Sequence, residues 1–525
     1  MKTLGEIIER NAACHPDKEG IVFAAKRVRF ADYAVRCQQL AASLYAEGVR
    51  RSDRVAVLSM NRVEILEVYG ACELSGFLPC PINFRLASEE IAYILADSAP
   101  AVLLFEDQYA PMIEALRPRF PNIRLFISIG TPVAGTIAYE DFLASGAQRS
   151  TPIRSRPSDY AHLIYTSGTT GRPKGAVRTH ANAIGYSQLL ATNCEMSFDG
   201  RALLVTPLFH IGAKSQQFAQ HWLGGTIVVH RQFDPRAVLE AMQNEHITFM
   251  TLVPTIVQAL IDVPTVKSFD LSSIRVLNTA GAPITPVLLQ RAIEVFGRVF
   301  MQQYGMTEGL ATVMFSSEMR PNGSADDVKR IGSVGHAMIG VEVRVVDEHD
   351  NDCPIGVVGE VLNRSPALFD HYWNNSAATL EAMRDGWYHS GDMGYFDEKN
   401  YLYLVDRKKD MIISGGENIY SREVEIALAR HPNVKDAAVI GIPDPYWGET
   451  VRAIVAAVPG TTPSEPELIE HCRSLIAHYK CPKSVIFVEA LPVLPTGKVN
   501  KVLLREQHGQ RAKLSKDSKS TQPVR

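Results

Sequence analysis

A regular alternation of helical and strand segments is the feature of this sequence that most restricts its fold. Residues 31–47 carry apolar side chains at spacings of four and three and end at Gly48, which predicts one apolar helix face and its C-terminal stop. The same reasoning predicts further helices at 63–74, 88–95 and 235–244, and strands at 53–60, 101–105, 161–165, 202–207, 246–253 and 273–280. Such alternation is typical of layered α/β folds with a largely parallel sheet.

The C-terminal part of the chain has a different texture. Short alternating strands, such as 341–346 and 357–363, predict a small antiparallel barrel or sheet between residues 331 and 405. Residues 410–505 predict a compact α+β unit, in which Ser464 and Glu467 form a capping box at the start of a helix. We expect a disordered tail at 508–525, because this segment is rich in Lys, Ser, Gln and Arg.

Length and composition restrict the class of protein. A chain of 525 residues is too long for a single core and should divide into domains. The net charge of −3 gives no reason to expect nucleic-acid binding. Eight scattered cysteines without a C-x-x-C pair favour buried thiols in a reducing compartment. With no signal-peptide pattern and no apolar run long enough to span a bilayer, we expect a cytoplasmic protein.

The segment 165–175 carries the clearest chemical signal. It reads Y-T-S-G-T-T-G-R-P-K-G and combines hydroxyls and glycines with Lys174. Glycines let the backbone approach a ligand closely, and hydroxyls, N–H groups and a lysine can surround an anion. The composition indicates a phosphate-holding loop. It is not a Walker loop, because Lys174 lies between Pro173 and Gly175. The alternative for so short a cluster is an ordinary turn between two elements.

Four further motifs follow along the chain. Residues 301–308 read M-Q-Q-Y-G-M-T-E, 388–392 read Y-H-S-G-D, 404–420 read L-V-D-R-K-K-D-M-I-I-S-G-G-E-N-I-Y, and 495–501 read P-T-G-K-V-N-K. Taken singly, they could be a core tyrosine, a turn cap, a solvated linker and a surface lysine. Their significance lies in occurring together and in this order.

As a set, these motifs resemble those of the adenylate-forming superfamily: acyl- and aryl-CoA synthetases, peptide-synthetase adenylation domains and beetle luciferases. The resemblance runs from residue 5 to residue 505. It implies a large AMP-binding domain at 1–408, with layered α/β sheets and a β-barrel-like subdomain, and a mobile α+β domain at 409–507. Such enzymes convert a carboxylate into an acyl-adenylate with loss of pyrophosphate, and a nucleophile then displaces AMP.

The resemblance also implies roles for the matching residues. The ATP phosphates would contact Thr166, Ser167, Gly168, Thr169, Thr170 and Lys174. Glu308, together with Thr166, would hold Mg²⁺, and Thr307 would contact the α-phosphate. The rest of the nucleotide would contact Gly281, Ala282, Pro283, Gln303, Tyr304, Gly305, Met306, Asp392 and Arg407, with Tyr304 stacked on adenine and Asp392 and Arg407 at the ribose.

The C-terminal motifs match the moving parts of the family. Lys498 matches the lysine that reaches the carboxylate and α-phosphate during adenylation, where an ammonium would stabilise the developing charge. Lys409 matches the hinge between domains. Gly415 and Gly416 match the loop that enters the site for the second half-reaction, once the small domain has rotated.

Three segments favour coenzyme A as the acceptor. Arg85, in N-F-R-L, resembles the CoA-ligase arginine that meets a CoA phosphate, and Trp447 lies where related ligases contact CoA. Tyr479 and Lys483 resemble an aromatic-Lys-x-Pro-Lys segment, from which Cys481 departs by replacing a basic residue. A ligase that loads a carrier protein, a catalytically silent nucleotide-binding member and a luciferase-like oxygenase are the alternatives.

The carboxylic acid itself is not named by the sequence. His210 matches the aromatic gate of the acyl pocket. Other pocket candidates are Thr279, Ala280, Gln302, Gln303, Gly305 and Met314. The small residues among them leave room for an aromatic ring or a medium acyl chain, so we expect a medium-chain, branched or aromatic acid. The oligomeric state, a homodimer included, stays open.

Overall fold

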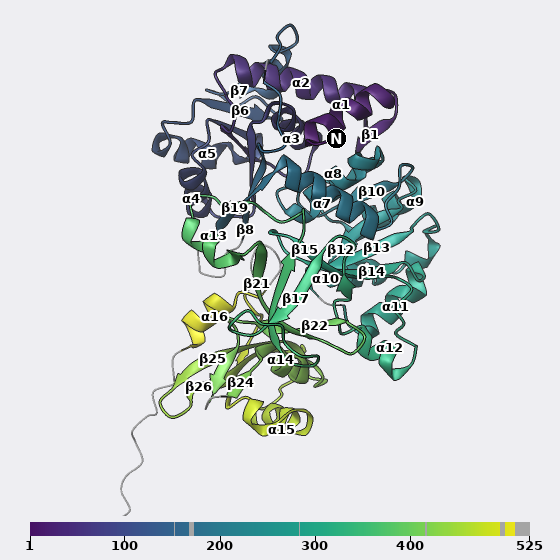
Figure 1. Ribbon diagram of the computed structural model, residues 1–525, viewed down its shortest axis with the longest axis vertical. Helices are drawn as coiled ribbons and strands as arrows, with labels where there is room; N and C mark the ends of the chain where they lie inside the picture. The colour runs from purple at the N-terminus through teal and green to yellow at the C-terminus, as the bar shows by residue number, and fades with distance from the viewer. Residues whose placement is uncertain (152, 167–172, 283, 415–416, 494–498, 510–525) are drawn as a thin grey trace, which may run out of the picture. The chain divides into compact units, whose positions relative to one another are not determined.

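The computed structural model describes residues 1–525 except 152, 167–172, 283, 415–416, 494–498 and 510–525 (Figure 1). The described residues form two compact units. The first comprises the described parts of 1–390 together with 395–403, and the second comprises 391–394 and the described parts of 404–509. The predicted boundary at 408/409 lies close to the start of the continuous part of the second unit, and the hinge at Lys409 stays a prediction.

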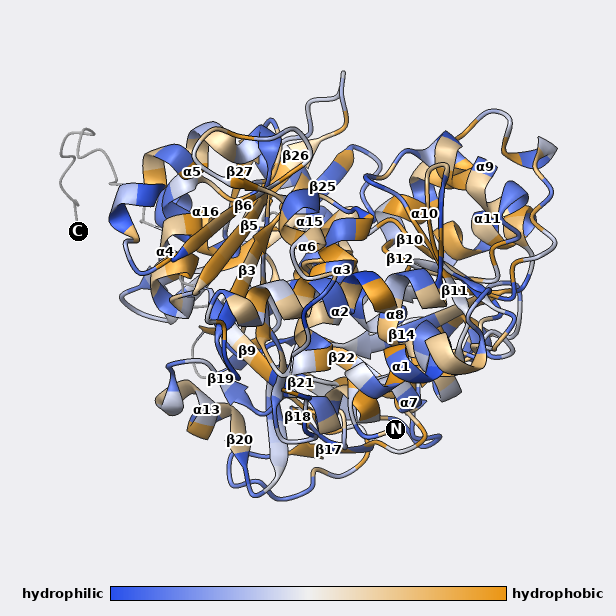
Figure 2. Cartoon of the chain, turned by 90° about the horizontal axis from the view of Figure 1, so that it is seen from above, coloured by the Kyte–Doolittle hydropathy of each residue, from blue (hydrophilic) through white to orange (hydrophobic). Residues whose placement is uncertain are grey.

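A five-stranded parallel sheet with helices on both faces forms the N-terminal part of the first unit. Its elements are α1 (Leu4–Cys14), α2 (Phe30–Ala46), β3 (Arg54–Leu58), α3 (Val63–Ser75), β4 (Leu78–Ile82), α4 (Ser88–Ser98), β5 (Val102–Glu106), α5 (Ala110–Leu116), β6 (Leu125–Ile129), β7 (Ile137–Ala138) and α6 (Tyr139–Ala144). The strand order is β4-β3-β5-β6-β7. Val55 and Val57 of β3 face the core with α2 and α3, whereas Ala56 and Leu58 face α4 and α5. Burial on both faces explains why β3, β5 and β6 are orange in Figure 2.

A nine-stranded sheet forms the rest of the first unit's α/β part. Its elements are β1 (Glu19–Phe23), β2 (Lys26–Arg29), α7 (His180–Asn193), β10 (Arg201–Leu204), α8 (Ile211–Leu223), β11 (Thr226–Val229), α9 (Pro235–Asn244), β12 (Phe249–Leu252), α10 (Pro254–Ile261), β13 (Val276–Ala280), α11 (Pro286–Phe296), β14 (Phe300–Gly305), β15 (Leu310–Met314), α12 (Ala325–Arg330) and β16 (His336–Ala337). The order is β16-β15-β14-β13-β12-β10-β11-β1-β2. The strands from β1 to β14 in this order pair in parallel, whereas β2, β15 and β16 are antiparallel additions at the edges. One face packs on α9, α10 and α11, and the other on α7 and α8.

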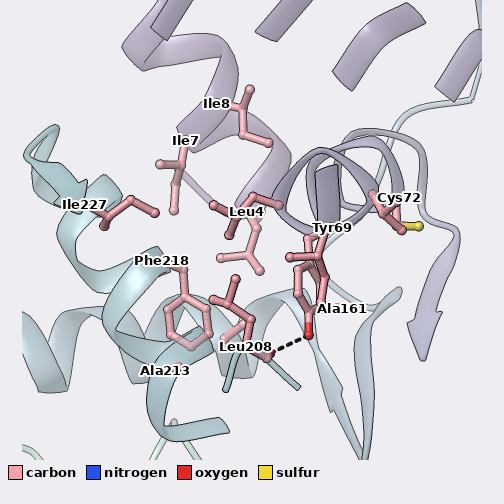
Figure 3. Close-up of a cluster of buried hydrophobic side chains, with 14 of the residues drawn as sticks. Leu4, Ile7, Ile8, Tyr69, Cys72, Ala161, Leu208, Ala213, Phe218 and Ile227 are labelled. Atoms are coloured by element: carbon pink, nitrogen blue, oxygen red, sulfur yellow. Dashed lines mark hydrogen bonds between the residues drawn. The ribbon is translucent and has the colours of Figure 1, made fainter. Parts of the chain in front are cut away.

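The two sheets share one apolar core. Figure 3 shows side chains from α1, α3 and α8 meeting in it, among them Leu4, Tyr69 and Phe218. Tyr69 is completely buried, and its hydroxyl donates to the carbonyl oxygen of Leu208 at 2.8 Å. The one polar atom of this side chain is therefore satisfied inside the core.

A three-stranded antiparallel sheet carries the predicted phosphate loop. Its elements are β8 (Tyr160–Thr166), β9 (Lys174–Thr179) and β19 (His371–Tyr372), in the order β19-β9-β8, and α13 (Ser376–Ala382) follows β19. The strand before the loop was expected from the sequence, and the strand after it was not. The loop is consequently the connection of a β-hairpin.

The expected antiparallel sheet between residues 331 and 405 is confirmed. Its strands are β17 (Glu342–Val346), β18 (Gly359–Arg364), β20 (Met383–Arg384), β21 (Trp387–Phe396) and β22 (Leu402–Arg407). They follow the order β17-β18-β21-β20, with β22 also paired to β21. The β17–β18 and β20–β21 pairs are antiparallel.

The second unit is an α+β structure, as the sequence predicts. Its elements are β23 (Ile412–Ser414), β24 (Glu417–Ile419), α14 (Ser421–Ala429), β25 (Val434–Asp444), β26 (Gly448–Ala457), α15 (Glu465–Leu475), β27 (Ser484–Val488) and α16 (Lys501–His508). The strand order is β24-β23-β26-β25, with β27 paired to β26. Val439 packs with α14 and α15, whereas the neighbouring Ile440 packs with Leu504 of α16. The capping box is confirmed, since the Glu467 N–H donates to Ser464 Oγ and the Ser464 N–H donates to the Glu467 carboxylate.

All eight cysteines carry free thiols. Cys14 is exposed and Cys353 is partly buried, and the other six are buried, as expected from their scattered positions. Burial raises the pKa of Cys80 to about 12 and also raises the pKa of Cys37 and Cys72. These thiols stay protonated at neutral pH.

The helices of both units are short. The longest described one is α2, with 17 residues. No helix in the described ranges has both the length and the apolar character that crossing a bilayer requires.

The shared core leads to a test of stability. Phe218 is 2% exposed and packs edge-on against Tyr186, with ring centroids 5.8 Å apart. We expect Phe218→Ala to lower the free energy of unfolding by about 3–5 kcal/mol, because the vacated space lies between two sheets that cannot both collapse into it. Urea denaturation of the full chain measures the change. Phe218→Leu keeps most of the volume and should cost about 1.5 kcal/mol or less; equal losses for the two variants would contradict this packing.

Candidate active site

The predicted phosphate loop begins and ends on paired strand residues. Thr166 at the end of β8 lies opposite Lys174 at the start of β9, and Thr166 Oγ1 donates to the Lys174 carbonyl oxygen at 3.3 Å. Ser167, Gly168, Thr169 and Thr170 lie outside the described residues. The hairpin therefore fixes the distance between the two ends of the loop and places the Lys174 side chain at its mouth.

Side chains from distant segments anchor this hairpin. The Tyr165 hydroxyl donates to Asp97 Oδ2 at 2.6 Å, and the Trp373 indole N–H donates to the Asp97 carbonyl oxygen at 3.1 Å. The Trp373 N–H also donates to the Gly175 carbonyl oxygen at 2.7 Å. Burial and the neighbouring carboxylate of Asp97 raise the pKa of Tyr165, so its phenol remains a donor. Both sides of the hairpin are thus tied to the surrounding fold.

Lys174 and Glu308, two predicted ATP-site residues, meet at Tyr372. The Lys174 ammonium lies 5.1 Å from the centroid of the Tyr372 ring, within the range of a cation–π contact. The Tyr372 hydroxyl donates to Glu308 Oε1 at 2.6 Å. The carboxylate of Glu308 is 8% exposed and has more acceptor sites than this single hydroxyl fills. The structure therefore brings a cation and an anion together around one phenol.

Arg178 fixes the backbone next to Glu308. This guanidinium is fully buried, and it donates to the carbonyl oxygens of Thr307, at 2.8 Å, and of Ala367. Burial lowers the pKa of Arg178 to about 10, against the opposing effects of Tyr186 and Glu308. The group stays charged at neutral pH, so the bonds to the two carbonyl oxygens persist.

The predicted adenine-binding segments lie on neighbouring parallel strands. Ala280 at the end of β13 pairs with Gln303 of β14. Gly281 follows with a φ of +80°, a conformation that favours glycine. At Gly305 a Cβ atom would lie 2.9 Å from the Gly309 carbonyl oxygen, which excludes larger residues without a backbone shift. Pro283 lies outside the described residues. Ligands of open α/β sheets bind at such carboxyl ends of parallel strands.

The structure separates the acyl-pocket candidates into two groups. Gln302 is buried and donates to the Ser333 carbonyl oxygen at 2.7 Å, and Thr279 is buried and donates to the Met301 carbonyl oxygen at 2.9 Å. Met314 is completely buried in the core with α9 to α11. These three residues face the opposite side of the sheet from Gln303, so the prediction that they share one pocket with it is wrong. Successive residues of a strand alternate between faces, and the sequence did not say which face is which.

The predicted acyl gate lies beside the predicted CoA segment. The rings of Phe209 and Phe84 meet edge to face, with centroids 5.4 Å apart, and the Arg85 guanidinium lies 5.5 Å from the Phe84 centroid. His210 caps α8, and its Nδ1 accepts a hydrogen bond from the Gly212 N–H at 3.1 Å. That bond holds the ring and leaves Nε2 as the proton-bearing nitrogen of the neutral form.

Within the second unit, the two predicted ribose ligands form an ion pair. Arg407 Nε lies 2.5 Å from Asp392 Oδ1, and Asp392 is 6% exposed. Lys409 lies two residues further along the chain. Partial burial, together with the positive charges of Arg407 and Arg505, lowers the pKa of Lys409 to about 8, although Asp410 and Asp392 oppose the shift.

The predicted CoA-contacting residues of the second unit are on its surface. Trp447 is 50% exposed and Tyr479 is 45% exposed, and Lys483 is exposed as well. Cys481 is buried, with its thiol donating to the Ala477 carbonyl oxygen at 3.5 Å. The family resemblance led us to consider a basic, ligand-contacting residue at this position. The cysteine found there is a core side chain instead. Gly415, Gly416 and Lys498 lie outside the described residues.

Sequence reasoning missed Tyr372, Arg178 and Asp97. Each acts through a partner far away in the chain, as Tyr372 does with Glu308 and Arg178 with Thr307. A tyrosine in a short strand and an arginine in a hairpin carry no local pattern that distinguishes them. The described residues contain no group of three or more His, Cys, Asp or Glu side chains arranged for a metal ion.

Residues 8–373 match the family of AMP-binding enzymes, and residues 423–498 match the C-terminal domain of these enzymes. The chain belongs to the AMP-binding enzyme family. Feruloyl-CoA synthase from Amycolatopsis sp is 38% identical over 511 residues, which cover 96% of this chain and 99% of that protein. Indoleacetate–CoA ligase from Aromatoleum aromaticum is 37% identical, and the match covers 96% of this chain and 98% of that protein. The solved structure of ATP-bound MatB from Rhodopseudomonas palustris matches with a TM-score of 0.85 at 28% identity. The match covers 96% of this chain and 99% of that one.

Membership of this family confirms the resemblance drawn from the motifs. The chain is an AMP-binding acid–thiol ligase, and the layered α/β architecture with a small C-terminal domain is that of its structural neighbours. The roles of single residues are taken up as proposals below.

The pKa of Lys409 gives a prediction for the second unit. Because the ammonium titrates near pH 8, its amine should react with acetic anhydride half-maximally near that pH, whereas ordinary lysines do so near pH 10.4. Below pH 8 the charged ammonium protects the residue. Mass spectrometry after brief labelling across a pH series measures the midpoint. Arg407→Gln removes a neighbouring positive charge and should move the midpoint upward; an unchanged midpoint in this variant would contradict the contribution of Arg407, although burial would still account for most of the shift.

Proposed function

We propose that this protein is an ATP-dependent acid–CoA ligase that acts on a medium-chain, branched or aromatic carboxylic acid. The observation that carries the proposal is the meeting of Lys174 and Glu308 at Tyr372, directly beside the hairpin that holds the phosphate loop. In this arrangement the cation could bind the phosphates of a nucleoside triphosphate, and the carboxylate could bind its metal ion. The names of the feruloyl-CoA synthase and indoleacetate–CoA ligase relatives favour an aromatic acid.

In the first half-reaction, a carboxylate oxygen attacks the α-phosphorus of ATP and pyrophosphate leaves. Lys174 and the loop hydroxyls, beginning with Thr166, bind the β- and γ-phosphates and orient them for departure. Thr307 meets the α-phosphate from a backbone that Arg178 holds in place. Lys498 supplies positive charge to the oxygens of the reacting phosphorus, where charge develops. The adenine would be surrounded by Tyr304, Gly305, Met306, Gly281, Ala282 and Pro283, with Asp392 and Arg407 at the ribose.

The side chains present fit a magnesium ion shared with the nucleotide. Mg²⁺ prefers oxygen ligands, and protein sites usually supply one or two carboxylates while substrate phosphates and water supply the rest. Glu308 offers the carboxylate, with acceptor sites beyond the one that Tyr372 occupies, and Thr166 offers a hydroxyl. The ion would neutralise phosphate charge.

In the second half-reaction, the thiol sulfur of CoA attacks the acyl carbon and AMP leaves. Arg85 would bind a CoA phosphate, and the exposed Trp447, Tyr479 and Lys483 would contact the rest of the cofactor. Rotation about Lys409 would exchange Lys498 for Gly415 and Gly416 at the site. His210, fixed by its bond to the Gly212 N–H, would border the acyl group.

Pyrophosphate release tests the proposal directly. The full-length protein is incubated with Mg-ATP and a panel of aliphatic and aromatic acids, each with and without CoA. We expect sustained turnover only with CoA and only on one class of acid. Turnover that does not need CoA would overturn CoA as the acceptor and point to a carrier protein, and silence across the panel would overturn the ligase assignment.

Lys498→Ala should separate the two half-reactions. We expect adenylate formation to slow by about 10²–10³-fold, because a charge that stabilises the transition state is lost. Thioester formation from a supplied acyl-adenylate should remain close to that of the unmodified protein, since Lys498 has by then left the site. Single-turnover assays with each starting material measure the two rates. An equal loss in both would contradict this division of roles.

A further inference from the structure

A chain of polar side chains lies on one face of the nine-stranded sheet, next to the predicted adenine segment. Asn278 of β13 donates through Nδ2 to Gln303 Oε1 of β14 at 2.7 Å and to Thr251 Oγ1 of β12 at 3.2 Å. Gln216 of α8 accepts from the Thr251 N–H at 3.3 Å and donates to the Gly212 carbonyl oxygen at 2.8 Å. Three adjacent strands and one helix thus contribute to a single network, which we call the amide chain.

The amide chain interrupts a face that is otherwise apolar. Val276, Met301 and Val313 project from the same face into the core with α7 and α8. Burying amide groups among such neighbours costs free energy unless each polar atom finds a partner. The amide chain leaves some of its groups without a partner among the described residues.

Two polar groups of the amide chain have no hydrogen-bond partner among the described residues. Asn278 is 1% exposed, and its Oδ1 has no hydrogen-bond partner among the described residues. Gln303 uses Oε1 for the bond to Asn278, and no described residue bonds to its Nε2. If the N and O atoms of both amides are exchanged, the bond between Asn278 and Gln303 reverses its direction. One donor and one acceptor then still lack a partner. The pair therefore offers a donor and an acceptor at once.

The partly exposed members of the amide chain lie near the carboxyl ends of their strands. Gln303 and Thr251 are partly exposed, and Gln303 directly precedes Tyr304 and pairs with Ala280, beside the predicted adenine segment. An acid whose carboxylate lies at the α-phosphate can extend its distal end along this face. Gln302, one residue earlier, is bonded on the opposite side and cannot contribute.

We propose that Asn278 and Gln303 recognise a hydroxyl group on the ring of an aromatic acid, so that the natural substrate is a hydroxylated aryl acid. A hydroxyl both donates and accepts, and it would accept from Gln303 Nε2 and donate to Asn278 Oδ1. This inference rests on the proposed acid–CoA ligase activity and narrows its substrate class. Carboxylates and cations fit less well, since each satisfies only one of the two free ends.

The test compares matched acids in the full-length protein. The probes are cinnamic acid, its 3-hydroxy and 4-hydroxy derivatives, and 4-methylcinnamic acid, in which a methyl group replaces the hydroxyl at nearly the same size. We expect kcat/KM for the better hydroxylated acid to exceed that for the methyl analogue by about tenfold or more, because the analogue leaves both buried groups unpaired. Pyrophosphate release with ATP and CoA measures each value.

Asn278→Leu removes the polar atoms and keeps the volume of the side chain. We expect the preference for the hydroxylated acid to fall to about threefold or less in this variant, mostly through loss on the hydroxylated acid. The preference is a ratio within one preparation, so partial unfolding of the variant does not change it. Thr279→Val is the matched control: it alters the adjacent residue, which faces the other side, and should leave the ratio as it is.

The outcomes separate this inference from the function on which it rests. Turnover of aryl or other acids without preference for a hydroxyl, or a preference that survives in Asn278→Leu, would overturn the inference and leave the ligase activity standing. Silence on every acid would overturn both. A preference that Asn278→Leu abolishes and Thr279→Val retains would support it.

Discussion

The buried charge of Arg178 is the interaction on which the candidate site depends most. A guanidinium removed from water must be compensated by good acceptors, and here the carbonyl oxygens of Thr307 and Ala367 provide them. Arg178 belongs to β9, the same strand that begins with Lys174. One short strand thereby sets both the cation at the end of the predicted phosphate loop and the backbone from which Glu308 extends. Loss of that charge would disturb two segments that are distant in the chain.

The parallel sheet decides where the remaining groups can gather. Strands β12, β13 and β14 end at a common edge, so Thr251, Ala280 and Gln303 come together although they are far apart in sequence. Along each strand, successive side chains then point to opposite faces of the sheet. This explains how one strand can carry a buried amide at Gln302 and a partly exposed amide on the opposite face at Gln303.

Local periodicity was enough to predict much of the fold. The helix at 235–244 agrees with α9 at both ends, because Asp234 caps a strongly amphipathic segment. The strand β9 was not predicted, since its pairing with β8 depends on the turn between them. Tyr372 and Arg178 could not be found at all, because their roles arise only when β19 and β9 meet. Motif resemblance predicted the candidate site residues, and tertiary contacts showed the partners of those that the structure describes.

The buried thiols have a consequence for chemical selectivity. An acyl-adenylate reacts with any thiolate that reaches it, so an enzyme that makes one risks acylating its own cysteines. Burial keeps most of these sulfur atoms out of reach, and the raised pKa of Cys37, Cys72 and Cys80 keeps them in the unreactive thiol form. These buried thiols are thereby protected from acylation by such an intermediate.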